Sequence, residues 1–181
     1  MSEFKEISTK NLQKSIERLT KLADYLRDNV PNQRFDLDTF VNHEKDIFGR
    51  KEDLKTVRKE LKEGFCGTTA CAVGHACMMP EFQKKGMRVR IVDSSGWGSS
   101  EGNYLAATFK DKDGNIFEGF EAAQKFFKIS EDRAEKLFSP DGYNHGGWGP
   151  SNVSKSQVVK AIRDYVYRAK KHLAKREVVE V

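Results

Sequence analysis

The segment at residues 66–79, CGTTACAVGHACMM, constrains the fold more than any other part of the chain. Nearly every side chain in it is small or apolar. A helix of that character is buried on most sides, and its small residues let neighbouring elements approach closely. We therefore predict a buried helix that starts near Thr68 and is entered through a tight turn at Cys66 and Gly67. Pro80 is expected to end this helix, since proline breaks a helix interior.

Amphipathic helices are predicted on both sides of this segment. Apolar residues recur at three- and four-residue spacing after Ser8, and Val30 followed by Pro31 marks the end of that helix. Similar patterns predict helices at residues 53–63, 121–129 and 131–138, and a long last helix capped by Ser154. The helical part should therefore form most of the structure.

A small antiparallel sheet is predicted between these helices. Residues 87–92 alternate with the period of a strand. Residues 104–110 and 115–120 should form a hairpin, because Asp113 and Gly114 between them suit a tight turn. The predicted fold class is α+β, a mainly helical single domain over residues 1–181 with three antiparallel strands.

Composition limits the classes of protein to which the chain can belong. Its 181 residues are 38% hydrophobic and 33% charged, and no apolar run approaches the roughly 18 residues of a membrane span. The three cysteines lie close together, unlike the distributed even set of a disulfide scaffold, so we expect reduced thiols. The first residues lack the apolar core of a secretory signal. We expect a soluble cytoplasmic protein that does not bind a membrane.

The charge pattern argues only weakly for a nucleic-acid partner. The net charge is +5, from 32 basic and 27 acidic residues, and most basic residues have an acidic neighbour within one helical turn. Positive charge is concentrated only in the last helix, at Arg168, Lys170, Lys171, His172, Lys175 and Arg176. Cations near a helix C-terminus are also favoured by the helix dipole, so a solvated helix end explains them as well.

Cys66 is the candidate nucleophile of a cysteine-dependent hydrolase or transferase. A thiol at the N-terminus of the predicted helix would have a lowered pKa. His145 could act as its base, and Asp141 or Asn152 could orient the imidazole. The Cys66-Gly67 start of a small-residue helix is faintly similar to bacteriocin-processing, papain-like cysteine peptidases, although Thr68 stands where those enzymes commonly carry proline. For Cys71, Cys77 and His75, packing alone suffices as an explanation.

A zinc site is the second alternative. Thiolate and imidazole ligands suit zinc, and Cys66, Cys71 and His75 could be completed by His145 or His43. The spacing is unlike that of zinc fingers or ribbons. We therefore predict no bound metal and no cofactor.

Two glycine-rich loops, at residues 93–103 and 139–150, carry aromatic side chains that could converge on a flat polar ligand. Backbone amides of these loops could contact an anionic part of the same ligand. The residues of this predicted site are Trp97, Tyr104, Tyr143, His145, Trp148, Gly67 and Thr68.

The chain resembles a group of small, largely uncharacterised proteins of tailed bacteriophages and their hosts. The resemblance rests on residues 35–40 (FDLDTF), on Cys-Gly-Thr-x-x-Cys-x-x-Gly-His-Ala at 66–76, and on residues 127–138. It implies a phage or mobile-element origin and names no activity. Our leading interpretation is a phage-type accessory protein of the host cytosol that binds a host protein or a small polar, nucleotide-like ligand. The alternatives are the cysteine enzyme, and a zinc-binding or nucleic-acid-binding protein.

Overall fold

The protein is described by a computed structural model, which covers residues 4, 6–37, 42–43, 68–93, 103–143 and 153–179. The helices are α1 (Thr9–Asn29), α3 (Ala72–Met78), α4 (Pro80–Lys84), α5 (Gly119–Phe127), α6 (Glu131–Phe138) and α7 (Lys155–Val179). The strands are β1 (Asn42–His43), β2 (Thr68–Thr69), β3 (Met87–Asp93), β4 (Asn103–Lys110) and β5 (Ile116–Glu118). The predicted α+β class, mainly helical with a small antiparallel sheet, is confirmed.

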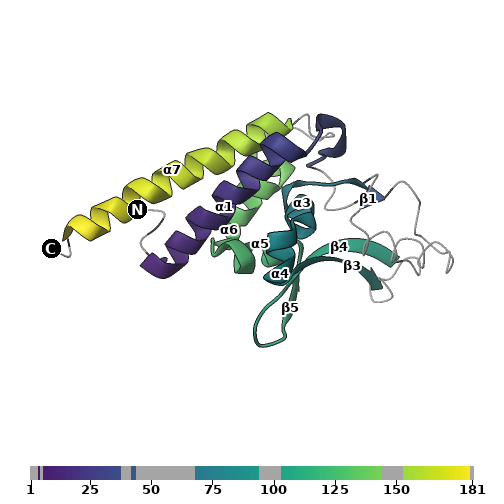
Figure 1. Cartoon of the computed structure of the whole chain (residues 1–181), viewed down its shortest axis with the longest axis horizontal. Helices are drawn as coiled ribbons and strands as arrows, with labels where there is room; N and C mark the ends of the chain where they lie inside the picture. Colours follow the sequence, from purple (N-terminus) through teal and green to yellow (C-terminus); the bar gives the residue numbers. More distant parts are fainter. Residues whose placement is uncertain are drawn as a thin grey trace.

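Helices α1 and α7 form an antiparallel pair (Figure 1). The Ser8 side chain caps α1 by accepting a hydrogen bond from the amide of Asn11. At one end of the pair, the Arg176 guanidinium donates to the Phe4 and Ile7 carbonyls at 2.7 and 2.8 Å. At the other end, the Lys155 ammonium donates to the carbonyl oxygen of Val30. These contacts fix the relative position of two helices that lie at opposite ends of the sequence.

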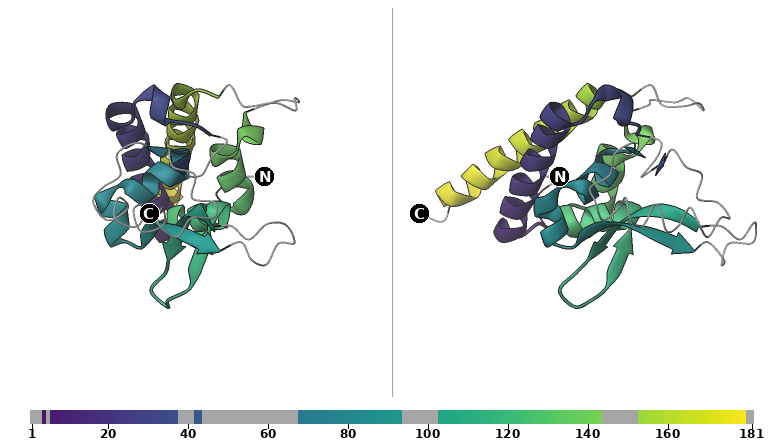
Figure 2. Two further views of the ribbon diagram at one scale, coloured as in Figure 1. Left: turned by 90° about the vertical axis from the view of Figure 1, so that its right-hand side faces the viewer. Right: turned by 45° about the vertical axis from the view of Figure 1, so that its right-hand side comes forward.

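The three-stranded sheet lies at the end of the molecule away from the chain termini (Figures 1 and 2). Its strand order is β3-β4-β5, and both pairs are antiparallel. The hairpin turn between β4 and β5 is closed by the Asp111 carboxylate, which accepts hydrogen bonds from the amides of Asp113 and Asn115 at 2.9 Å. All three predicted strands are therefore present, with β5 ending at Glu118 because α5 begins at Gly119.

The predicted start of the central helix near Thr68 is wrong. Thr68 and Thr69 form strand β2, which pairs with β1, and α3 begins only at Ala72. Ala70 is held extended by two backbone bonds, in which its amide donates to Arg34 and its carbonyl accepts from Asp36. The backbone groups of this segment are thus hydrogen-bonded to other extended segments, as in a sheet, before the helix starts. Pro80 does not simply end a helix, because it is also the first residue of α4, a position where its missing N–H has no cost.

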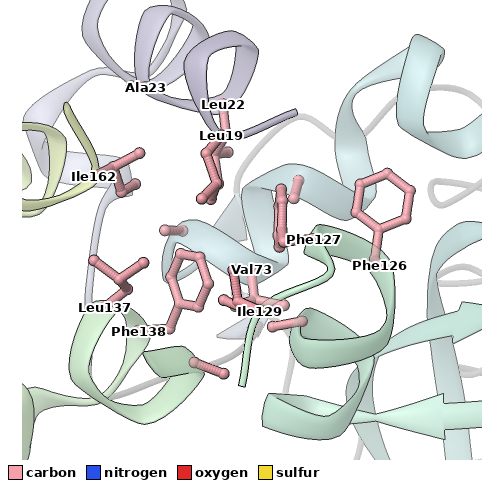
Figure 3. Packing of buried hydrophobic residues seen from close by; sticks show 14 of the residues in the cluster. Leu19, Leu22, Ala23, Val73, Phe126, Phe127, Ile129, Leu137, Phe138 and Ile162 are labelled. Atoms are coloured by element: carbon pink, nitrogen blue, oxygen red, sulfur yellow. The ribbon is translucent and has the colours of Figure 1, made fainter. Parts of the chain in front are cut away.

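The hydrophobic core surrounds α3, as the sequence predicts. Residues 72–77 are all buried, and α1, α5, β3 and β4 contact this helix. Figure 3 shows Val73 among side chains of α1, α5 and α6, and the aromatic rings of Phe127 and Phe138 lie 5.5 Å apart. The predicted helices α1, α6 and α7 are confirmed, and α5 covers the predicted 121–129 helix with a shift towards the N-terminus. The predicted helix at 53–63 lies outside the described residues.

Candidate functional site

The structure removes one argument for Cys66 as a nucleophile. Cys66, Gly67 and His145 lie outside the described residues, but α3 begins at Ala72, so Cys66 is not at its N-terminus. Asp141 is exposed in a short 3-10 turn at Pro140–Gly142. The start of α3 at Ala72 therefore does not support the helix-dipole argument for a lowered Cys66 pKa, and the pairing of Cys66 with His145 stays a prediction.

The other two cysteines are buried thiols. Loss of hydration raises the pKa of Cys71 to about 11, although the amides of Gly74 and Val73 act in the opposite direction. Desolvation likewise raises the pKa of Cys77 to about 12, and its sulfur lies 3.8 Å from the carbonyl oxygen of Thr108. Since the thiolate is the reactive form, both residues serve packing at neutral pH.

His75 holds the segment after α1 against α3. Its Nε2 donates to the carbonyl oxygen of Arg34 at 2.8 Å, and its ring is stacked on Phe35 with 6.2 Å between centroids. Desolvation is the main cause that lowers the pKa of His75, and the nearby Lys155 and Arg34 charges act in the same direction. The imidazole is thus neutral, with the proton on Nε2, and its role is structural.

This burial predicts an acid-sensitive contribution to stability. The pKa of His75 is lower in the folded protein than in the unfolded chain, so between these two values only the unfolded state binds the proton. Stability from His75 is full above a pH of about 6.5 and falls at lower pH, by at most about 1.4 kcal/mol per pH unit. His75→Gln keeps a donor for the Arg34 carbonyl and cannot titrate. Urea unfolding at pH 7 and pH 5 should therefore show a smaller acid loss in this variant, and equal losses would contradict the assignment.

Of the predicted zinc ligands, only Cys71 and His75 have side chains that the structure describes. Within the residues that it describes, no group of three His, Cys, Asp or Glu side chains is placed to hold a metal ion. His75 already uses Nε2 for the Arg34 carbonyl, and the Cys71 thiol is protonated. The remaining predicted ligands, Cys66, His145 and the side chain of His43, lie outside the description.

Two of the predicted ligand-binding aromatics have other partners. The Tyr143 hydroxyl donates to the carbonyl oxygen of Leu137 at 2.8 Å, and desolvation raises its pKa. The Tyr104 hydroxyl donates to the Glu118 carboxylate at 3.3 Å across the sheet. Trp97, His145, Trp148 and Gly67 lie outside the described residues, and Thr68 is described only as backbone. The described members of the predicted set thus hold their own elements together.

A cavity of about 420 Å³ opens where the last turns of α1 meet the first turns of α7. It is lined by Arg27, Lys155, Ser156, Val159, Lys160, Arg163 and Asp164. The first of these lies on α1 and the others lie on α7. Sequence reasoning missed this site because the two elements are far apart in the chain. The one available signal was the series of cations at the start of the last helix, facing a predicted partner helix.

Two aspartates that are not part of the cavity lining form ion pairs with its two guanidinium groups. Arg163 Nη2 donates to Asp24 Oδ1 at 3.0 Å. Arg27 donates two hydrogen bonds to Asp28, at 2.5 and 2.6 Å, in the bidentate arrangement that fixes a guanidinium. Side chains held in this way lose less freedom when a ligand binds.

The lining of the cavity carries a positive charge. Its four cations face one lining carboxylate, Asp164, which leaves a net charge of +3. Asp24 and Asp28 reduce this to +1 for the cluster as a whole. Val159, which is 7% exposed, adds an apolar surface between the charged groups. The cavity can therefore offer several hydrogen-bond donors to an anionic group of a ligand, and an acceptor and a small apolar contact to its other groups.

Comparisons of the chain with protein-family models, with curated proteins and with solved structures found no match. Across the described ranges, no helix is both long and apolar enough to cross a membrane. The candidate site therefore rests on its own geometry, as the pocket formed by α1 and α7.

Proposed function

We propose that the protein binds a small phosphate-bearing ligand, of the nucleotide class, in the cavity between α1 and α7. The observation that carries this proposal is the cavity itself, in which four cations surround a concave surface. Its volume of about 420 Å³ lies within the usual range for small-molecule sites. The proposal keeps the small polar ligand expected from the sequence and moves its site from the loops to the helix pair.

The cations would contact the phosphate groups of such a ligand. Lys160 is exposed on the first turns of α7, and Lys155, whose ammonium also donates to the Val30 carbonyl, lies about one turn before it. Charge-assisted hydrogen bonds from ammonium or guanidinium groups to phosphate are about twice as strong as neutral ones. Arg27 and Arg163 are already held by aspartates, so they add fixed positive charge beside the lysines.

The remaining lining residues favour a ligand that carries polar groups and a ring in addition to its phosphate. Asp164 can accept hydrogen bonds from amino or hydroxyl groups, and Val159 can contact the face of a ring. A nucleotide has a phosphate, a sugar hydroxyl, a base amino group and a flat ring. A simple anion would leave the Asp164 carboxylate as a repulsive neighbour, so inorganic phosphate should bind more weakly.

Binding is better supported than catalysis at this place. Ser156 is the lining residue with a hydroxyl, and its Oγ lies 2.9 Å from the Ser154 hydroxyl rather than next to a base. A serine nucleophile needs an adjacent general base. The resemblance to phage-encoded proteins supports a role in an infected host cell, where nucleotides are abundant, and action in the host cytosol is part of the proposal.

Calorimetric titration with ATP, AMP and adenosine tests the proposal. At low salt, ATP should bind more tightly than AMP, and adenosine should bind weakest. Lys160→Glu reverses a charge at the cavity and should weaken ATP binding about tenfold or more, the size of one charge-assisted contact. Lys112→Glu, the same change on the β4–β5 hairpin and away from both α1 and α7, is the matched control. Equal ATP affinity in wild type and Lys160→Glu, or no binding of ATP at millimolar concentration, would contradict the proposal.

A further inference from the structure

The C-terminal half of α7 carries charge of one sign on its outward side. Arg168, Lys170, Lys171 and Lys175 are exposed, whereas Tyr165 and other members of the opposite stripe are buried. No acidic residue occurs from Tyr165 to Arg176, between Asp164 and Glu177. We call the four exposed cations together with Tyr167 the distal face of α7.

This short stretch accounts for the net charge of the whole chain. Residues 165–176 contain five arginines and lysines, the four of the distal face and Arg176. The other 27 of the chain's 32 basic residues are balanced by its 27 acidic residues. This part of α7 therefore carries an excess of positive charge, whereas the formal charges of the remaining chain balance. A helix segment of this kind has the electrostatic pattern of a surface that attracts a polyanion.

The inward side of the same turns is anchored to the body of the protein. Arg176 donates to the Phe4 and Ile7 carbonyls, and its Nε donates to His172 Nε2 at 3.1 Å. The ring of His172 lies 5.4 Å from that of Phe4. In Figures 1 and 2 this end of α7 lies away from the sheet, at the far end of the helix pair. The distal face is thus carried by a helix whose inward side is anchored to the body of the protein.

Tyr167 adds an exposed aromatic ring to this positively charged face. It is 67% exposed and lies one turn before Lys170 and Lys171 on the outward side. An exposed aromatic ring within a positively charged surface is the arrangement on which unpaired bases stack while cations contact the backbone. A membrane surface fits less well, because the apolar residues of these turns are buried in the protein and cannot enter lipid.

We infer that the distal face of α7 binds single-stranded nucleic acid, with Arg168, Lys170, Lys171 and Lys175 on phosphates and Tyr167 stacked on a base. This interaction is separate from the cavity, which lies at the other end of α7 and uses Lys160. Recognition is independent of sequence, since stacking and phosphate contacts are available to every base. The four cations predict the salt dependence, because each phosphate contact releases counterions.

Fluorescence anisotropy with a labelled oligothymidylate of about 20 nucleotides tests this inference. The plot of log K against log salt concentration should have a slope of about −3, from four contacts at roughly 0.7 each for a single strand. The double variant K170E/K171E should weaken binding more than tenfold and reduce the slope to about −1.4. Tyr167→Ala should weaken binding at least fivefold and leave the slope unchanged, since stacking involves no counterion.

Two controls separate this inference from the cavity proposal. Lys112→Glu changes a lysine on the β4–β5 hairpin, whose side chain is 90% exposed, and should bind the oligonucleotide as wild type does. Lys160→Glu should weaken ATP binding about tenfold or more and keep most oligonucleotide binding. Unchanged affinity in K170E/K171E, a slope near zero, or binding to anionic phosphatidylserine vesicles without binding to the oligonucleotide would overturn the inference.

Discussion

Replacing Phe127 with alanine is expected to lower the free energy of unfolding by about 3–5 kcal/mol, the range for losing a buried aromatic ring from a packed core. Phe127 is fully buried on α5. Its ring centroid lies 6.0 Å from Phe82, 5.1 Å from Phe126 and 5.5 Å from Phe138. These partners come from α4, α5 and α6, so the substitution leaves a cavity where three helices meet.

Guanidinium unfolding followed by circular dichroism measures this loss. Ile116→Ala is the matched control, because Ile116 is a large apolar residue on β5 that is 48% exposed. Its replacement should cost well under half as much, since little surface is buried at that position. A loss below about 1 kcal/mol for Phe127→Ala would contradict the packing described for the centre of the core.

Gly86→Ala is expected to destabilise the protein by about 3 kcal/mol through the backbone alone. Gly86 has a φ of +103°, and an added Cβ would lie 2.2 Å from the carbonyl oxygen of Lys110. That carbonyl cannot move away easily, because the amide of Lys110 donates to the Gly86 oxygen at 3.0 Å. The side chain therefore meets both a disfavoured dihedral angle and a fixed backbone atom.

Gly114→Ala separates these two effects. Gly114 also has a positive φ, +93°, but the nearest atom to its added Cβ is the Lys110 Cε at 4.0 Å. This control carries only the dihedral cost, about 1–2 kcal/mol. Thermal and chemical unfolding should rank Gly86→Ala well below Gly114→Ala in stability. Equal stability of the two variants would show that the close approach to Lys110 does not constrain the turn before β3.

The sequence was sufficient to predict the positions of helices and strands that bury one face. Helix α6 begins and ends at the predicted residues, and α1, α7 and the three strands follow from their apolar periods. The start of α3 was mispredicted because small residues such as Ala70 are compatible with helix and strand alike. The extended conformation there depends on β1 and Arg34, which lie far away in the sequence. Local propensity cannot identify such partners.

The candidate site was less predictable than the fold. Packing was the correct interpretation of Cys71, Cys77 and His75, because burial follows from the small-residue pattern. The cavity depends on how α1 and α7 are paired, and on Asp24 and Asp28 orienting the arginines. No local motif encodes that arrangement. The exposed Tyr167 was also missed, since the apolar spacing of α7 shows which residues are buried and says little about the opposite face.

The central claim is that the cavity between α1 and α7 holds a nucleotide. Its most direct test is a two-dimensional ¹H–¹⁵N NMR titration of the labelled full-length protein with ATP. The account predicts saturable shifts at the amides of the first turns of α7, around Lys155, Ser156 and Lys160, and at the last turn of α1, around Arg27. Shifts confined to the sheet or to α3, or an unchanged spectrum at millimolar ATP, would contradict it.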